Sequence, residues 1–187
     1  MELSIVELVV AVTGASGSSL AARLLEVAGE LGVHAHLIVT GAAKQVAKLE
    51  GVELSAPVEY RVDDLAAPVA SGSFLVDGMV VVPCSMNTLA KLAAGVEDNL
   101  VLRSAAAVLR NKRPLVLVPR EAPLTEIQLE NLLRVKRAGA DVLFPVLTFY
   151  HEPATVSDLV DFVVGRVFDL LGVPNDLFRR WEGRGSS

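Results

Sequence analysis

The stretch Val9-Val10-Ala11-Val12-Thr13-Gly14-Ala15-Ser16-Gly17-Ser18-Ser19-Leu20 decides how the chain is expected to fold. It opens with a run of apolar, mostly β-branched residues, which is typical of a buried strand. Two glycines and several small residues follow. From Leu20 to Leu31, apolar residues then recur at steps of three and four, the pattern of an amphipathic helix. The stretch therefore predicts a strand, a tight turn and a helix.

The predicted turn has features that suit an anionic ligand. Gly14 and Gly17 can adopt positive φ and permit another molecule to approach the backbone closely. The first N–H groups of the following helix, at the positive end of its dipole, favour phosphate or another anion. The glycine spacing is not G-x-G-x-x-G, so NAD is not implied. A plain strand-to-helix turn without a ligand would explain the same residues, so a ligand site here needs support from other parts of the chain.

Composition narrows the class of protein. A chain of 187 residues fits one domain with a full core, and its 52% hydrophobic residues fall in short Val, Leu and Ala blocks rather than in a membrane-spanning run. A net charge of −5 argues against a nucleic-acid partner. Met1–Glu7 is acidic and has no basic region, so we expect no signal peptide. The single cysteine, Cys84, excludes an internal disulfide and fits a cytoplasmic protein.

Strand and helix patterns alternate along the chain. We expect strands at about 8–13, 33–39, 58–62, 78–83, 114–118 and 141–144. We expect helices at about 18–31, 42–49, 84–94, 98–110, 126–137, 157–171 and 176–181. Short connections between alternating elements predict an α/β fold with a doubly wound, mostly parallel sheet. The expected domain covers residues 1–183, and residues 184–187 are expected to be a disordered tail.

Ligands of such sheets bind beyond the carboxyl ends of the strands. The segments that follow these predicted strand ends are Gly14-Ala15-Ser16, Thr40-Gly41, Pro83-Cys84-Ser85, Pro119-Arg120-Glu121 and residues 145–150. Small hydroxyl residues follow three of the strands, and an arginine–glutamate pair follows a fourth. This convergence predicts a ligand site at that edge of the sheet.

The segments at these strand ends resemble the UbiX-type flavin prenyltransferases, which have a Rossmann-like flavoprotein fold. The matching segments are Thr13–Gly17 (TGASG), Ser71–Phe74 (SGSF), Pro83–Leu89 (PCSMNTL), Arg113–Leu124 (RPLVLVPREAPL), Phe149–Pro153 (FYHEP) and Arg180–Gly183 (RWEG). They follow the order and spacing of the family over nearly the whole chain. RPLVLVPREAPL together with FYH is the most specific signal, because no general structural requirement makes this combination recur.

The resemblance implies an activity. Enzymes of this family transfer a dimethylallyl group from dimethylallyl phosphate to N5 and C6 of reduced FMN. The product, prenylated FMN, is the cofactor of UbiD-type decarboxylases. The family works without a metal and forms dodecamers whose sites lie where subunits meet. We therefore expect FMN, dimethylallyl phosphate, a UbiD-type recipient and a homo-oligomer, with no membrane partner. Whether the monophosphate or the diphosphate is preferred stays open.

The same resemblance assigns residues to FMN. The expected FMN-binding residues are Gly14, Ala15, Ser16, Thr40, Ser85, Met86, Asn87, Thr88 and Arg103. Ser16 would lie near N5, and the segment from Ser85 would hold the phosphate and ribityl chain at a helix start. Some relatives have Lys where this chain has Asn87. Ser85 and Thr88 also fit a simple helix cap.

The resemblance further assigns the prenyl phosphate and the catalytic groups. The residues expected to bind the prenyl phosphate are Arg110, Arg120, Tyr150 and Arg166. Guanidinium groups suit this role because they bind phosphate oxygens in pairs, although an interface ion pair would also explain Arg166. The expected catalytic residues are Ser16, Glu50, Glu121 and Trp181.

The resemblance implies chemical roles for Glu121 and Trp181. Glu121 would move a proton around the departing phosphate, and the face of Trp181 would stabilise an allylic cation. A surface glutamate at a helix end would explain Glu50 equally well, and Trp181 could simply anchor the chain end.

Two other functions fit a flavoprotein fold. FMN-dependent cysteine or phosphopantothenoylcysteine decarboxylases use a helix histidine and a Pro-x-Met-Asn motif. This chain has Pro119-Arg120-Glu121 instead, and no histidine in its first or third predicted helix. A flavin-binding protein without catalysis would not need the additional arginines and Tyr150. The chain's histidines lack clustered acidic partners in the sequence, so we expect no metal site.

Overall fold

Short β-branched segments form a six-stranded sheet in the computed structural model, which describes residues 6–183. The strands are β1 (Glu7–Val12), β2 (His34–Val39), β3 (Val58–Tyr60), β4 (Gly78–Cys84), β5 (Leu115–Pro119) and β6 (Asp141–Val142). Their order across the sheet is β3-β2-β1-β4-β5-β6, and every neighbouring pair is parallel. The predicted doubly wound parallel sheet is confirmed, and its strand order reverses between β1 and β4.

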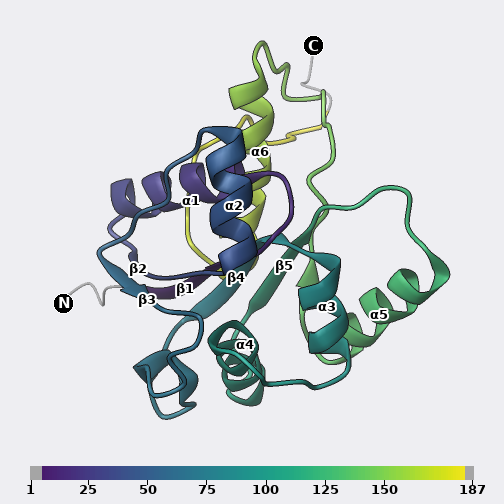
Figure 1. The fold of residues 1–187 in the computed structure, drawn as a ribbon. Helices are drawn as coiled ribbons and strands as arrows, with labels where there is room; N and C mark the ends of the chain where they lie inside the picture. Colours follow the sequence, from purple (N-terminus) through teal and green to yellow (C-terminus); the bar gives the residue numbers. More distant parts are fainter. Residues whose placement is uncertain (1–5, 184–187) are drawn as a thin grey trace.

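Helices cover both faces of this sheet (Figure 1). They are α1 (Ser18–Glu30), α2 (Gly41–Glu50), α3 (Met86–Ala93), α4 (Leu100–Arg110), α5 (Glu126–Arg137) and α6 (Val156–Leu171), with a short 3-10 turn at Pro68–Ala70. Buried side chains of α1 and α6 share one apolar cluster, which Ala43 of α2 joins. Those of α3, α4 and α5 share the other. The fold is therefore a three-layer α/β/α sandwich.

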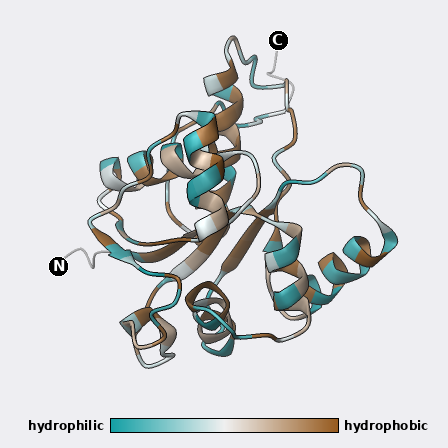
Figure 2. Ribbon diagram, in the orientation of Figure 1, coloured by the Kyte–Doolittle hydropathy of each residue, from teal (hydrophilic) through white to brown (hydrophobic). Residues whose placement is uncertain are grey.

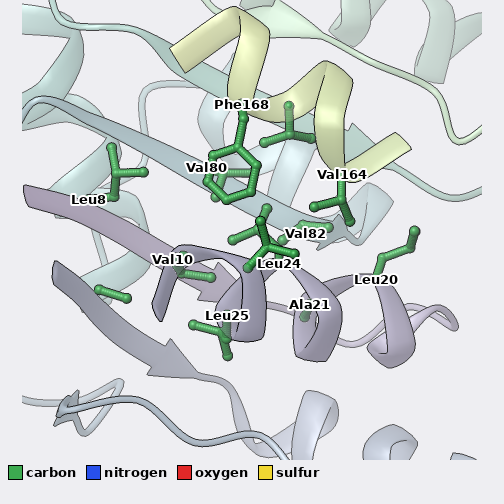
Figure 3. Close-up of a cluster of buried hydrophobic side chains, with 14 of the residues drawn as sticks. Leu8, Val10, Leu20, Ala21, Leu24, Leu25, Val80, Val82, Val164 and Phe168 are labelled. Carbon is green, nitrogen blue, oxygen red and sulfur yellow. The ribbon is translucent and has the colours of Figure 1, made fainter. Parts of the chain in front are cut away.

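The central strands are apolar on both faces because helices cover both. Leu8, Val10 and Val12 of β1 point into the α1/α6 cluster, whereas Val9 and Ala11 point into the opposite one. Figure 2 shows the resulting apolar colouring in the middle of the sheet and polar outer helix faces. In Figure 3, Phe168 of α6 lies over Val80 and near Leu24, with no exposed surface of its own.

Most element boundaries lie within about two residues of those expected, but one predicted helix is absent. Residues 173–183 form no helix. Instead, the Asn175 side chain donates hydrogen bonds to the Gly165 carbonyl (3.2 Å) and to the Asp169 carboxylate (3.2 Å), and Arg180 pairs with the same carboxylate at 2.6 Å. Isolated helices this short are unstable in water, so contacts with α6 determine the path of the chain.

The edge strand and the chain end are the two other elements with expected boundaries. The expected strand at 58–62 is shorter, because β3 is an edge strand that ends at Tyr60. The expected disordered tail, residues 184–187, lies outside the described residues, as do the first five residues. Among the helices of residues 6–183, none is long and apolar enough to cross a membrane.

The α1/α6 cluster gives the first testable prediction. Replacing the fully buried Phe168 by Ala removes a large side chain from a packed core and should lower the free energy of unfolding by about 3–5 kcal/mol. Leu49, which is 88% exposed, provides the control: Leu49→Ala should change stability by less than about 0.5 kcal/mol. Urea unfolding monitored by circular dichroism measures both, and equal effects would contradict the assigned core.

Candidate functional site

The ends of β1 and β4 are joined through one buried hydroxyl group. Thr13 follows β1 directly, and its side chain donates a hydrogen bond to the Pro83 carbonyl at 2.9 Å. The same oxygen accepts a hydrogen bond from the Ser85 backbone N–H at 2.7 Å. Thr13 is 1% exposed, so both bonds are shielded from water. The turn after β1 and the start of α3 are thus fixed side by side at the point where the strand order reverses.

The turn after β1 packs against α2. A Cβ atom at Gly14 would lie 2.5 Å from the Ala42 side chain, so this position requires glycine for helix packing. Gly17 has a φ of 113°, which glycine adopts without strain. The sequence predicted that both glycines permit the approach of a ligand. At Gly14 the group that approaches the backbone is α2 of the same chain.

Glu50, at the end of α2, occupies the N-terminus of α1. Its two carboxylate oxygens accept hydrogen bonds from the Gly17 N–H at 2.9 Å and the Ser18 N–H at 2.7 Å. Partial desolvation would raise the pKa of Glu50. Hydrogen bonds from the Ser16 side chain and from these N–H groups outweigh this effect and lower the pKa from 4.5 to about 2. The expected ligand anion at this helix terminus is therefore replaced by an internal carboxylate.

Hydroxyl side chains cap the two other helices at this edge. Thr40 accepts a hydrogen bond from the Ala43 N–H at 3.2 Å, and Ser85 accepts one from the Thr88 N–H at 3.2 Å. The helix-cap interpretation is confirmed: Ser85 caps α3 by accepting a hydrogen bond from the Thr88 N–H, and Thr40 caps α2 in the same way. The Thr40 hydroxyl, which accepts such a bond, keeps its proton for another acceptor, whereas the Ser85 and Thr88 hydroxyls are hydrogen-bonded to each other at 3.0 Å. Beside Ser85, Met86 is half-buried and Asn87 is exposed.

Arg103 lies in the first turn of α4 and carries an unsatisfied donor. The residue is half-buried, and its Nε atom is buried without a hydrogen-bond partner among the residues described. Buried guanidinium nitrogens are normally paired, so an unpaired one indicates a missing acceptor. A phosphate oxygen is an acceptor of the right charge.

Arg120 and Glu121 follow β5 at the same edge. The Arg120 N–H donates to the Cys84 carbonyl at 3.4 Å, which ties this loop to the end of β4. The Arg120 guanidinium lies 4.0 Å from the Glu121 carboxylate, and both side chains are partly exposed. With Phe144, the pair lines a cavity of about 330 Å³. A cation and a carboxylate thus share one opening.

Tyr150 and Trp181 meet on the outer side of α6, at 5.7 Å between ring centroids. Phe162 of α6 lies 5.9 Å from Tyr150 and is stacked on His151 at 4.9 Å. Sequence reasoning missed Phe162 and His151, although His151 belongs to the FYHEP segment and Phe162 is an apolar residue four positions before Arg166. Trp181 is 68% exposed, so it lies over the surface of this aromatic group.

Arg166 lies one helical turn beyond Phe162 and is paired within the chain. Its guanidinium is 2.9 Å from the Asp169 carboxylate, which also binds Arg180 at 2.6 Å. The ion pair considered for Arg166 therefore exists, but within the same chain. Arg166 thus lies one turn along α6 from Phe162, which contacts Tyr150.

Arg110 is far from the other expected phosphate ligands. It is the last residue of α4, and its guanidinium pairs with Glu97 at 3.3 Å. From there the chain enters the amino end of β5, whereas Arg120 follows the carboxyl end. Five residues of strand separate the two ends by roughly 13 Å. A single chain does not bring Arg110 and Arg120 together.

One premise of the sequence analysis is wrong. His34 and His36 do have an acidic partner: the Glu7 carboxylate lies 2.8 Å from a ring nitrogen of His34 and 2.7 Å from one of His36. Glu7 is 27 residues from His34 in the sequence, and only the pairing of β1 with β2 places them opposite each other.

Comparison with known proteins decides the family. The family model described as Flavoprotein matches residues 1–168. The curated flavin prenyltransferase UbiX of Methanocaldococcus jannaschii is 42% identical, and the alignment covers 94% of this chain and 98% of that protein. This chain belongs to the UbiX-type flavin prenyltransferase family.

Solved structures of the family agree with this fold. The crystal structure of AnUbiX (PadA1) in complex with FMN and dimethylallyl pyrophosphate matches with a TM-score of 0.93 and 43% identity, over 96% of this chain and 98% of that one. A dodecameric FMN-dependent UbiX-like decarboxylase from Escherichia coli O157:H7 matches with a TM-score of 0.90 and 43% identity, over 95% of this chain and all of that one.

The carboxylate at the start of α1 gives a prediction about pH. Because folding lowers the pKa of Glu50 from 4.5 to about 2, its ionised form stabilises the protein fully above pH 4.5. That contribution is lost as the pH falls through 4.5 towards 2. Glu50→Gln should therefore destabilise the protein by about 1 kcal/mol at pH 7, the scale of a helix cap, and by much less near pH 2.

The exposed Glu53, which lies three residues further along, provides the matched control. Glu53→Gln should leave the pH dependence of the wild-type protein unchanged. Unfolding midpoints measured between pH 2 and 7 test both variants. A Glu50→Gln protein that loses stability in acid as steeply as the wild type would contradict the assigned hydrogen bonds.

Proposed function

We propose that this protein transfers a dimethylallyl group from dimethylallyl phosphate or diphosphate to reduced FMN. The bond between the allylic carbon and the phosphate oxygen breaks as that carbon bonds N5 of the flavin, and the prenyl double bond then takes up a proton so that its tertiary carbon can bond C6. N5 and C6 each lose one proton; one proton in total is kept by the former double bond, and the other leaves with phosphate or diphosphate. The reduced flavin supplies the electron-rich nitrogen and carbon for both bonds. The observation that carries this proposal is the Arg120–Glu121 pair after β5, in a member of this family whose Arg103 on α4 has an unsatisfied buried Nε among the described residues.

The residues present fit FMN. The unsatisfied Nε of Arg103 lacks an acceptor that a phosphate supplies. The start of α3 offers backbone N–H groups, the Thr40 hydroxyl retains a proton to donate, and the hydrogen-bonded pair of Ser85 and Thr88 hydroxyls retains one between them. We propose that FMN is held by Gly14, Ala15, Ser16, Thr40, Ser85, Met86, Asn87, Thr88 and Arg103. The N-terminus of α1 does not contribute its first N–H groups, because Glu50 uses them.

Glu50 is proposed to position Ser16. With a pKa of about 2, its carboxylate is ionised at neutral pH, so it is a weak base and not a proton donor. It fixes the turn after β1 through the Gly17 and Ser18 N–H groups, and the nearby Ser16 side chain helps to lower its pKa. The fixed turn would orient the Ser16 hydroxyl at the edge of the site, where it can exchange a proton with a bound flavin.

Glu121 and Arg120 are proposed to act on the leaving group. The guanidinium binds phosphate oxygens and stabilises the charge that develops as the carbon–oxygen bond breaks. The carboxylate, 4.0 Å from it, is placed to move a proton to or from the same oxygens. Tyr150 and Arg166 are the proposed further ligands of this phosphate. Trp181, beside Tyr150, offers an aromatic face to the allylic cation.

A homo-oligomer, by analogy with the dodecameric relative, would complete the site. Arg110 and Arg120 lie at opposite ends of β5, so Arg110 could join this site only from a neighbouring subunit. Exposed apolar side chains supply area for such contacts: Leu129 and Leu133 on α5, and Leu147 and Phe149 in the loop before α6, are 49–68% exposed. We further propose a UbiD-type decarboxylase as recipient of the product and a cytoplasmic location.

The chain lacks the two features of the decarboxylase alternative, a helix histidine and a Pro-x-Met-Asn motif. His34 and His36 lie in β2 and His151 in a turn, so no histidine of the chain falls within a described helix. The segment after β5 is Pro119-Arg120-Glu121 rather than Pro-x-Met-Asn. A purely flavin-binding role would leave the Arg120–Glu121 cavity without a purpose.

Anaerobic incubation with reduced FMN and dimethylallyl phosphate, followed by mass analysis of the released flavin, tests the proposed function directly. The flavin should gain one C5 prenyl unit only when protein, reductant and prenyl donor are all present. The diphosphate is tried in parallel. Tightly bound but unmodified FMN with both donors would refute prenyl transfer and favour a flavin carrier or a decarboxylase.

Glu121→Gln should slow prenyl transfer without weakening FMN binding. The amide preserves the size of the side chain but cannot exchange a proton, so prenyl transfer should slow by roughly 100-fold or more. FMN affinity should stay near that of the wild type, because Glu121 is not among the proposed FMN ligands. Glu126→Gln, a change at an exposed glutamate in the first turn of α5, is the control and should keep the normal rate. Normal turnover by Glu121→Gln would exclude Glu121 from proton transfer.

A further inference from the structure

Three side chains with metal-binding atoms meet at the amino end of the sheet. Glu7 starts β1, and His34 and His36 belong to β2; the ligand atoms of all three lie within 4.8 Å of one another. In the register of these parallel strands, Glu7 pairs with His34 and Val9 with His36. Side chains two positions apart share one face of a strand, so the pairing itself brings the three together.

We propose that Glu7, His34 and His36 form a binding site for a divalent transition metal ion, with Zn²⁺ as the best match. Two imidazole nitrogens and one carboxylate oxygen are a common zinc ligand set, which leaves a fourth position for water. Imidazole nitrogen also disfavours Mg²⁺ and Ca²⁺, which prefer oxygen. His34 and Glu7 are about one-third exposed, so an ion and a water can reach the site.

The geometry is close to that of a bound site. One carboxylate oxygen of Glu7 lies 2.8 Å from Nδ1 of His34 and 2.7 Å from Nε2 of His36. Zinc bonds of about 2.0–2.1 Å at tetrahedral angles would separate these atoms by roughly 3.3 Å. Changes of about half an ångström in these two distances, with the two imidazole nitrogens brought together from within 4.8 Å, would replace two hydrogen bonds by metal bonds.

His36 is held in place by its surroundings. Its side chain is 4% exposed, and its other ring nitrogen lies 3.2 Å from the Tyr60 hydroxyl. The ring stacks on Tyr60 at 5.8 Å and meets the edge of Phe74 at 5.4 Å. Metal-bound histidines typically engage their second nitrogen in such a bond, which fixes the ring and the tautomer. Tyr60 thus supplies the outer contact that a metal site requires.

The local charge favours a cation. Desolvation would raise the pKa of Glu7, but the two imidazoles lower it overall, so this carboxylate is ionised at neutral pH. A second carboxylate, Asp77, accepts a hydrogen bond from the Glu7 N–H at 2.9 Å. The guanidinium of Arg113 lies 3.9 Å from Asp77 and offsets part of this negative charge. Two carboxylates face one guanidinium around the cluster.

This site is separate from the proposed prenyl-transfer site. Glu7 and Val12 are the two ends of β1, roughly 17 Å apart at about 3.3 Å per residue, and the FMN-binding turn begins beyond Val12. A metal here would link β1 to β2 without contact with either substrate. Its expected role is structural, since an ion that binds only the folded chain raises the stability.

Titration with Zn²⁺ alone tests the site, using tag-free protein first treated with a chelator. We expect one Zn²⁺ per chain by calorimetry and a higher melting temperature. His34→Gln and Glu7→Gln should each weaken binding at least tenfold, since even loss of an outer contact costs about 10–100-fold. His151→Gln, at the remaining histidine of the chain, should bind Zn²⁺ like the wild type.

Variants at His34 and Glu7 test the site without removing a buried side chain. His34 and Glu7 are partly exposed, whereas the buried His36 could be needed for folding, so circular dichroism of each variant accompanies the titration. Co²⁺ in place of Zn²⁺ should give the visible absorption of a tetrahedral ion, absent in Glu7→Gln. Absence of stoichiometric binding, or equal binding by the wild type and both variants, would overturn the proposal. Prenyl transfer by the chelated protein tests the other site independently.

Discussion

The hydroxyl group of Thr13 is the contact on which the site depends. It bridges the ends of β1 and β4 by bonding the Pro83 carbonyl and the Ser85 N–H, and it is shielded from water. A buried polar group that satisfies two partners fixes both, because leaving either unpaired costs about 1–3 kcal/mol. The strand order reverses between these two strands, where parallel sheets leave a crevice. One side chain therefore sets the relative position of the turn after β1 and the start of α3.

The hydrogen-bond donors at this edge of the sheet are of two kinds: some are paired with the Glu50 carboxylate, and one has no acceptor among the described residues. Glu50 satisfies the N–H groups at the start of α1, which a ligand phosphate would otherwise find. Arg103 retains a buried nitrogen without a partner among the described residues. In the proposed site, an anion would therefore bind towards α3 and α4 rather than at the turn after β1. Glu50 and Ala42 contact the turn on two sides without a ligand.

The proposed prenyl-phosphate ligands are distributed over distant parts of the chain. Arg120 and Glu121 follow β5, Arg166 lies on α6 with Tyr150 and Trp181 beside it, and Arg110 lies near the amino end of β5. Arg166 is already paired with Asp169 and Arg110 with Glu97. Such partly exposed pairs contribute little stability and can exchange partners at low cost. In the proposed oligomer, a neighbouring subunit would supply Arg110 to the phosphate site.

The sequence by itself determined the layered fold and most element boundaries, because period-2 and period-3.6 patterns report burial directly. It also located the strand-end segments, since their residues are consecutive. It could not find contacts between residues far apart in the chain. Glu50 at the start of α1, the Glu7–His34–His36 cluster and the aromatic group around Phe162 all depend on strand pairing or helix packing. The expected helix at 176–181 failed for the same reason, since hydrogen bonds from Asn175 and Arg180 to α6 outweigh a weak local preference.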